Sequence, residues 1–266
     1  MLLNARVNVN LSLISIMYNS QRFRLFPIKR VQKQSDRTYH HHCMLLLNRI
    51  VQFVALTSLK NGIDESHGLS HSMNTLYYAN QIYKSEAMLK PYLAQQENII
   101  YIASLIHDLC DKKYTTQPEQ QIQEIVEFLN KTHCLDHPEI EVITKIISTC
   151  SYSYVIKHGF PDLGKYQTAY HIVREADLLC SYDVDRCLLY QIYCKKSDLR
   201  EAFQNTNLYF QTKMFRLQKD NRFFTHFAKE ECKKKQEEAM NRLWFWKTMI
   251  EHSAFQSNRS NLRDPF

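Results

Sequence analysis

The stretch Ile99–Tyr114, IIYIASLIHDLCDKKY, decides both the fold and the chemistry expected of this chain. Its apolar residues have helical spacing, and the run ends in His107 and Asp108. Burying an imidazole beside a carboxylate is costly unless the two groups are paired or bind a metal ion. His71 upstream and Asp177 downstream also lie in or beside apolar helical runs. Two histidines and two aspartates at such positions predict a metal-binding cluster in a helical core.

The composition indicates an all-α protein. The chain has 266 residues and 44% hydrophobic content, enough for one sizeable core, and it contains only 4 Gly and 6 Pro. So few turn-forming residues argue against a sandwich or a barrel. Residues 148–160 are expected to form a polar aromatic loop. Helical spacing predicts helices over residues 44–60, 71–88, 97–109, 118–129, 136–147 and 166–193, and long amphipathic helices over residues 208–249.

Charge and cysteine content bear on partners and compartment. The net charge of +7 suits an anionic ligand such as a nucleotide, and it equally suits a protein without one. The basic residues are spread along the chain without a recognition motif, which argues against nucleic acid as a partner. The 8 cysteines form no CxxC pair and no convincing secretory signal precedes them, which favours reduced thiols and a cytoplasmic location. We expect no membrane partner, and the oligomeric state stays open.

The sequence divides into three expected segments. Residues 1–43 form an N-terminal extension, which has no acidic residue before Asp36 and carries a mostly apolar patch at Leu11–Met17. Such an N-terminus resembles a mitochondrial transit peptide, but it lacks a clear cleavage pattern, so a disordered or loosely docked extension is preferred. Residues 44–250 form the main domain, and residues 251–266 form a C-terminal tail.

Several blocks of the sequence carry a resemblance to a known family. The order His71, His107-Asp108, Asp177 resembles the H…HD…D signature of the HD-domain metal-dependent phosphohydrolase superfamily. The match is closer to a subgroup of small bacterial HD hydrolases that includes nucleoside triphosphate pyrophosphohydrolases. The blocks similar to this subgroup are Asp64-x-Ser66-His67-x-x-x-His71, His107-Asp108-x-x-Asp111-x-Lys113-Tyr114, Ile146–Ser153 and Ile172–Asp177.

The resemblance implies a helical bundle with a single metal-site cleft. In this family the ligands corresponding to His71, His107, Asp108 and Asp177 converge on one divalent cation. Mn²⁺ or Mg²⁺ is expected, with Fe, Co, Ni or Zn as alternatives. Two imidazoles and two carboxylates leave open coordination positions for a water molecule and a phosphate oxygen. The expected activity is hydrolysis of a nucleotide, or of a related phosphate ester or anhydride, by metal-activated water.

Other residues of the motifs complete the expected catalytic set. Lys113 would supply a positive charge to the phosphate groups, because lysine is a common phosphate-binding residue. Asp111 belongs to the same block as Lys113, and Asp108 serves both as a ligand and in catalysis. His67 is expected to support a metal ligand or contact the substrate, and not to act as a fifth ligand.

The chain also departs from the subgroup pattern. Where the subgroup has A-D-R-L-D, residues 176–180 are A-D-L-L-C, so an arginine and a second acid are missing. Asp183 or Asp185 could replace the acid, whereas nothing in the sequence restores the arginine. A degenerate HD domain that binds a nucleotide or a partner without turnover is therefore the alternative function. His133 and His158 could hold a second ion, but neither lies in a matching motif, and one ion is preferred.

Overall fold

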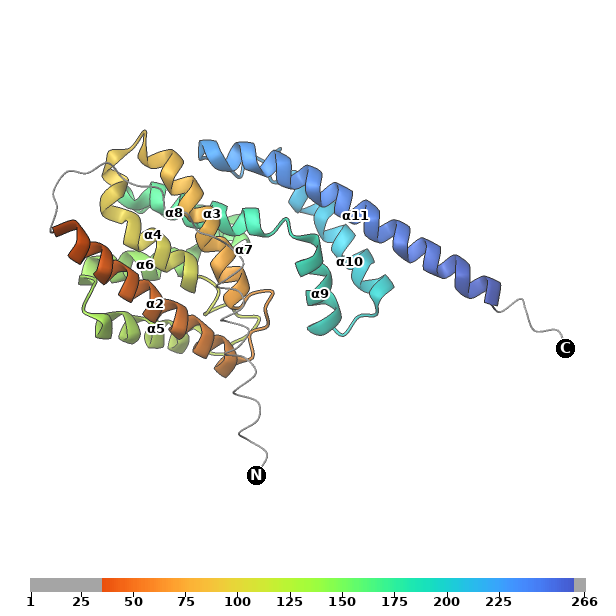
Figure 1. Cartoon of the computed structure of the whole chain (residues 1–266), viewed down its shortest axis with the longest axis horizontal. Coiled ribbons are helices and arrows are strands. Elements are labelled where there is room, and N and C mark those ends of the chain that lie inside the picture. Colours follow the sequence, from red (N-terminus) through yellow and green to blue (C-terminus); the bar gives the residue numbers. More distant parts are fainter. Residues whose placement is uncertain (1–34, 261–266) are drawn as a thin grey trace, which may run out of the picture. The chain divides into compact units, whose positions relative to one another are not determined.

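The computed structural model describes the backbone of residues 35–260 and the side chains of residues 44–252 (Figure 1). Within residues 35–260 every regular element is a helix and no strand occurs, which confirms the predicted all-α class. The α-helices are α2 (Ser35–Asn61), α3 (Leu69–Ala87), α4 (Glu97–Ile106), α5 (Pro118–Thr132), α6 (His137–Thr149), α7 (Tyr152–His158), α8 (Gln167–Cys180), α9 (Val184–Tyr193), α10 (Leu199–Thr212) and α11 (His226–Ser260). The 3₁₀ turns are η1 (Pro91–Gln96), η2 (Gly164–Tyr166) and η3 (Met214–Arg216).

Helix α4 lies at the centre of the core. It packs against α3, α6 and α8, and α3 also packs against α8 (Figure 1). From Ile99 to Ile106 every residue except Tyr101 is buried. A helix that is apolar on all sides is stable only when it is enclosed, and each fully buried isoleucine contributes about 1.5–3 kcal/mol. The apolar stretch that opens the sequence analysis therefore forms the central helix, and its two polar residues follow at its end.

Two predicted elements were wrong. The single helix expected over residues 166–193 is broken into α8 and α9, because the Asp183 side chain accepts a hydrogen bond from Arg186 N and so begins a new helix. The loop expected at residues 148–160 contains α7. Ser151 begins this helix by accepting a hydrogen bond from Tyr154 N. In both places one short polar side chain at an N-cap decides the local structure.

Several boundaries also differ from the sequence prediction. Helix α2 begins at Ser35, before the expected start at Met44, and α4 ends at Ile106 instead of Leu109. The expected N-terminal patch and the end of the tail lie outside the described residues. Within the described part of the chain, no helix combines the length and the apolar character that a membrane crossing requires.

The N-terminus of α11 is bound by two buried carboxylates. Glu175 of α8 accepts hydrogen bonds from Phe224 N at 2.8 Å and Thr225 N at 3.1 Å. Glu86 of α3 accepts one from His226 N at 3.1 Å. Carboxylates are favoured at this position because the first N–H groups of a helix have no partner within it. Helix α11 is thereby attached to both α3 and α8.

Candidate metal centre

Three core helices bring four potential ligands together. His71 lies in the first turn of α3, and His107 is the C-cap residue of α4, with Asp108 directly after it. Asp177 lies within α8. Because α3 packs against both α4 and α8, these side chains converge although they are far apart in the sequence.

The distances between the polar atoms are short. His71 Nε2 lies 3.2 Å from His107 Nε2, 3.2 Å from Asp108 Oδ2 and 3.2 Å from Asp177 Oδ1. His107 Nε2 lies 3.4 Å from Asp108 Oδ2 and 3.7 Å from Asp177 Oδ1. With metal–ligand bonds of about 2.1 Å, neighbouring ligand atoms are about 3.0 Å apart in octahedral sites and about 3.4 Å apart in tetrahedral sites. His71, His107 and Asp108 therefore form a group that could hold a metal ion, and Asp177 contacts both of its imidazoles.

The surroundings of the His107 imidazole suit metal ligation. His107 Nδ1 lies 2.9 Å from Ser104 O. A carbonyl oxygen only accepts, so Nδ1 carries a proton, and Nε2, which faces the other potential ligands, is the nitrogen that could bind an ion. The side chains of His71 and His107 are 1% and 2% exposed, whereas those of Asp108 and Asp177 are 16% and 21% exposed. The carboxylate side of the group is thus the side that solvent and small molecules can reach.

The electrostatics of the group favour a positive charge at its centre. Burial lowers the pKa of His107, but the carboxylates of Asp108 and Asp177 outweigh burial and raise that pKa well above its usual value. Burial raises the pKa values of Asp108 and Asp177, but hydrogen bonds and charges from the two imidazoles outweigh it and hold both carboxyl groups below their usual range. A bound cation would meet the same demand for positive charge.

A hydrogen-bond chain joins the two N-terminal motif blocks beside this group. Lys113 Nζ lies 3.1 Å from His67 Nε2 and 3.3 Å from Asp111 Oδ2. Asp111 also accepts a hydrogen bond from Lys113 N at 2.9 Å, so it orients the lysine. His67 is mostly buried, and its ring centroid is 6.0 Å from that of His71. The predicted residues His67, Asp111 and Lys113 therefore lie together, and His67 places them next to His71.

Asp64 accepts hydrogen bonds at the other end of this series of hydrogen bonds. Tyr114 OH donates to Asp64 Oδ2 at 2.5 Å and lies 3.0 Å from His67 Nδ1. Cys194 Sγ donates to the same carboxylate oxygen at 2.9 Å. The N-cap residue of α3 is Gly68, which has no side chain to cap this helix. A Cβ atom on Gly68 would lie 2.9 Å from Asp64 O, so the tight loop before α3 requires glycine there.

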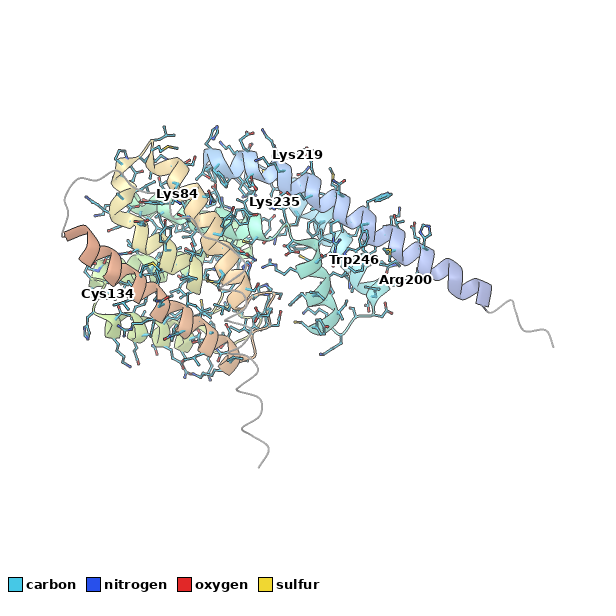
Figure 2. The ribbon with its side chains drawn as sticks, in the orientation of Figure 1. Lys84, Cys134, Arg200, Lys219, Lys235 and Trp246 are labelled. Carbon is cyan, nitrogen blue, oxygen red and sulfur yellow. The ribbon has the colours of Figure 1, made fainter. Side chains whose placement is uncertain are left out.

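Asp183 and Asp185, the two acids that could replace the missing aspartate, bind other groups. Asp183 caps α9. Asp185 accepts hydrogen bonds from Trp246 Nε1 at 2.7 Å and Arg242 Nε at 2.8 Å, which connects α9 to α11. Trp246 of α11 is labelled in Figure 2. Cys180, at the position of the second acid in the subgroup, is buried and lies 3.6 Å from Thr75 Oγ1. Neither Asp183 nor Asp185 restores the lost carboxylate at this point.

Two arginines lie in the region of Leu178, the position at which the subgroup has its arginine. Leu178 is 2% exposed and belongs to the apolar core. One turn before it, the buried side chain of Arg174 lies 3.5 Å from Glu175 Oε1. A second guanidinium comes from α9: Arg186 NH1 lies against His71 Nδ1 and donates to Ser66 O at 2.8 Å.

Sequence reasoning missed Arg186 and also Lys213, which directly precedes η3. Lys213 Nζ donates to Tyr209 OH at 3.1 Å and lies 4.2 Å from the ring centroid of Tyr152. Neither residue falls in a motif block, so no pattern singled them out. The helix start at Asp183 was a usable signal for Arg186, since it places that residue in the first turn of α9.

The other histidines of the motif region lie away from the group. His133 is the C-cap residue of α5, with a left-handed backbone at φ 54°. His158 is exposed at the end of α7, and its ring contacts Tyr154. Among the described residues, neither joins the metal-competent group.

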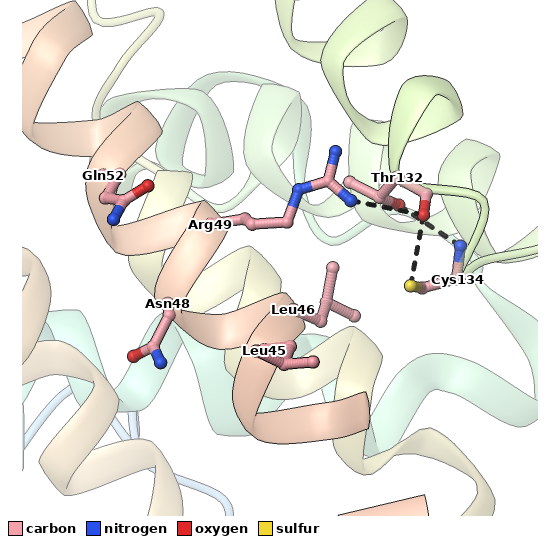
Figure 3. Close-up of a pocket in the computed structure, with 7 residues that line it drawn as sticks. All are labelled: Leu45, Leu46, Asn48, Arg49, Gln52, Thr132 and Cys134. Atoms are coloured by element: carbon pink, nitrogen blue, oxygen red, sulfur yellow. Dashed lines mark hydrogen bonds between the residues drawn. The ribbon is translucent and has the colours of Figure 1, made fainter. Parts of the chain in front are cut away.

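A hollow of about 500 Å³ opens elsewhere, between α2 and the end of α5 (Figure 3). Arg49 crosses it and donates to Thr132 O at 3.5 Å. None of the predicted site residues is among those that line it, namely Leu45, Leu46, Asn48, Arg49, Gln52, Thr132 and Cys134. This hollow is separate from the metal centre.

Comparison with known proteins supports the fold. A crystal structure of a Lactobacillus plantarum protein, solved as a structural genomics target, matches with a TM-score of 0.58 and 18% sequence identity. The match covers 77% of this chain and 97% of that chain. At this level of identity the likeness concerns the helical architecture alone. No family model matches the sequence, and no curated protein matches it.

Proposed function

We propose that this chain is an HD-type metal-dependent phosphohydrolase that acts on a nucleotide or a related phosphate ester or anhydride. The observation that carries the proposal is the approach of His71, His107, Asp108 and Asp177, whose ligand atoms lie 3.2–3.7 Å apart in the five measured pairs. The ordered motif blocks support the same assignment. In this proposal Asp177 is the fourth ligand of one divalent ion, Mn²⁺ or Mg²⁺.

The ligand set fits such an ion. A bound divalent cation would lower the pKa of a coordinated water and neutralise charge on a phosphoryl oxygen. The bond from Nδ1 of His107 to Ser104 O leaves Nε2 facing inward, as the nitrogen that would bind the ion in place of its proton. Asp108 and Asp177 remain ionised because their pKa values are held low. The exposed edges of these carboxylates mark the side from which a phosphate group would approach.

Lys113 and His67 have distinct roles in this proposal. Lys113 presents its ammonium to the phosphate oxygens, and Asp111 holds the lysine in position at 3.3 Å. Burial, followed by the nearby charges of Lys113 and Arg186, lowers the pKa of His67 to about 4, although Asp108 opposes this. His67 is therefore neutral at neutral pH, and its Nε2 accepts a hydrogen bond from Lys113. It orients the lysine that contacts the substrate.

The test is a nucleotide panel. The full chain, loaded with Mn²⁺, is incubated with nucleoside mono-, di- and triphosphates, cyclic nucleotides and a generic phosphodiester, and released pyrophosphate is separated from orthophosphate. The proposal expects turnover of at least one compound and loss of that turnover in the Asp177→Ala variant. Absence of hydrolysis across the panel with the metal-loaded protein would contradict it.

A second candidate is a degenerate HD domain that binds a nucleotide without turnover. One observation favours it: a buried thiol, Cys180, stands where the subgroup has its second acid, and Asp183 and Asp185 do not replace that acid. This candidate expects a nucleotide to raise the thermal unfolding temperature of the metal-loaded protein although no compound of the panel is hydrolysed.

A further inference from the structure

Two basic side chains beside the metal centre have no acidic partner. Arg186 NH1 contacts Ser66 O and the His71 ring, and Lys213 Nζ contacts Tyr209 OH and the Tyr152 ring. Over residues 44–252, neither side chain forms an ion pair with a carboxylate. Lys113 differs, because Asp111 Oδ2 lies 3.3 Å from its Nζ atom. Both unpaired side chains are also partly buried, where an unbalanced positive charge is costly.

Helix α8 fixes the position of Lys213 near the metal ligands. Tyr182, just after the end of α8, donates a hydrogen bond to Met214 O at 3.0 Å. This bond holds the turn at Lys213 against the end of the helix that carries Asp177. Burial lowers the pKa of Lys213, Asp177 raises it, and Lys113 and Arg186 lower it further. Lys213 is also bound by Tyr209 of α10, and α10 packs against α9, the helix that carries Arg186, so the two cations lie on neighbouring elements.

Charge balance at the centre calls for an anion. A divalent ion would offset the charges of Asp108 and Asp177, and Asp111 already offsets Lys113. Among the described side chains, Arg186 and Lys213 have no carboxylate at ion-pair distance, and Asp64, another acid of this region, is bound by Tyr114 and Cys194. Water screens the charges of the two partly buried cations poorly. A single phosphate group placed between the ion and Lys113 would leave both of them without a counter-charge.

We propose that Arg186 and Lys213 form a second phosphate subsite, which selects a substrate with two or more consecutive phosphate groups. This proposal rests on the phosphohydrolase function given above. One phosphate group lies at the metal ligands and Lys113, and the next lies at Lys213 and Arg186. Tyr209 and Tyr152 hold the lysine ammonium through a hydrogen bond and a cation–π contact at 4.2 Å. Only NH1 of the Arg186 guanidinium makes the contacts described, so further donors remain to bind a phosphate.

A binding experiment tests this subsite without requiring turnover. The full chain loaded with Mn²⁺ is titrated by calorimetry with orthophosphate and with methylenediphosphonate, whose P–C–P bridge resists hydrolysis. The unmodified protein is expected to bind the diphosphonate at least about tenfold more tightly than orthophosphate. Lys213→Met should remove about that factor for the diphosphonate and leave the affinities for orthophosphate and Mn²⁺ within about twofold. Lys213→Arg, which keeps the charge, should retain most of the preference.

A matched control is Lys165→Met. Lys165 Nζ also lies over a tyrosine ring, at 5.0 Å from the centroid of Tyr166, but it is exposed and precedes α8. Lys165 precedes Asp177 by about 12 residues, which corresponds to about 18 Å at the helical rise of about 1.5 Å per residue. This variant should bind both ligands like the unmodified protein. Equal losses in Lys165→Met and Lys213→Met would overturn the subsite, and so would equal affinities of the unmodified protein for the two ligands.

Further outcomes separate this proposal from the hydrolase proposal. If Lys213→Met does not fold, Lys213→Gln, whose side chain is one atom shorter and keeps a donor but loses the charge, takes its place with the same expectation. A protein that hydrolyses nothing but prefers the diphosphonate through Lys213 would refute the hydrolase and keep the subsite. Hydrolysis of a nucleoside triphosphate with unchanged KM in Lys213→Gln would keep the hydrolase and refute the subsite.

Discussion

Lys113 Nζ lies 3.1 Å from His67 Nε2, although 46 residues separate the two in sequence. An ammonium group only donates, so Nε2 is the acceptor and the ring proton of His67 is on Nδ1. Nδ1 in turn lies 2.7 Å from Ser66 Oγ, within the loop that leads into α3. The loop that carries His67 and the segment after α4 thus hold each other in place, beside the ligands that the same two segments supply.

Removing the ammonium of Lys113 should slow hydrolysis and leave the metal bound. In Lys113→Ala the rate is expected to fall on the order of ten- to a thousandfold, the range for losing one preorganised charge contact to a developing anion. Mn²⁺ affinity, measured by calorimetry, should stay unchanged because Lys113 is not a ligand. The exposed neighbour Lys112→Ala is the control, and similar rate losses in both variants would contradict a specific role for Lys113.

Removing one imidazole should abolish metal binding. His107 Nε2 lies 3.2–3.7 Å from ligand atoms of His71, Asp108 and Asp177, so His107→Ala leaves an incomplete set. The metal content of the purified variant, measured by atomic emission after dialysis against Mn²⁺, is expected to fall to the background level, and hydrolysis with it. His158→Ala, which changes an exposed ring, should keep full metal content. A fully loaded His107→Ala protein would refute the ligand assignment.

The structure changes the expectation for the missing arginine. From the sequence alone, Leu178→Arg would restore the subgroup residue and raise the activity of a weakened enzyme. However, Leu178 is 2% exposed within the apolar core, so an arginine there would be a buried charge without a partner. The free energy of unfolding, from urea denaturation, is expected to fall by about 3–5 kcal/mol. Leu189→Arg, at a side chain 48% exposed on α9, should change it little.

The glycine at the start of α3 should matter for both stability and metal affinity. In Gly68→Ala the new Cβ would lie 2.9 Å from Asp64 O, so the loop must shift. A cost of about 1–3 kcal/mol in unfolding free energy is expected, together with weaker Mn²⁺ binding because His71 follows three residues later. Gly62→Ala is the control: its φ of 64° makes alanine strained, but no atom lies within 4 Å of the new Cβ. It should lose stability and keep metal affinity.

A partly buried histidine outside the metal centre, His171, should make the fold sensitive to acid. Burial, with the nearby charges of Arg174 and Lys90, lowers the pKa of His171 from 6.5 to about 4. Between these values the unfolded chain binds the proton and the folded protein does not, so unfolding free energy falls as the pH drops from 6.5 to about 4. Urea denaturation at several pH values should show a shallower decline in His171→Gln. An unchanged slope in that variant, equal to that of His158→Gln, would refute this assignment.

The sequence predicted the helices whose apolar periodicity is long and uninterrupted. Helix α4 and the convergence of His71, His107 and Asp108 followed from one principle, that buried polar groups need a partner. The break between α8 and α9 did not follow, because apolar spacing continues through it and a single side chain, Asp183, decides where the second helix begins. The spacing of apolar residues does not show whether a single N-cap side chain will interrupt a helix that the spacing would otherwise continue.

The basic side chains of the site were outside the reach of pattern reasoning for a different reason. Arg186 contacts the His71 ring from α9, and η3, next to Lys213, returns to the end of α8, where Tyr182 OH donates to Met214 O at 3.0 Å. That return depends on tertiary packing, and the sequence around either residue has no unusual composition. Asp185 shows the reverse case, since its position in the sequence suggested a site acid, and in the structure it binds Arg242 and Trp246.

The ligand positions also bear on how the chain reaches its folded state. His71, His107 and Asp177 belong to separate helices, so the complete set of ligand atoms exists only after α3, α4 and α8 have docked. An ion with affinity for this set then acts as a cross-link across distant parts of the chain, and its binding energy becomes part of the folding energy. Binding of such an ion would link the stability of this protein to metal supply: a cell with little of the ion would then contain a larger share of unfolded chains.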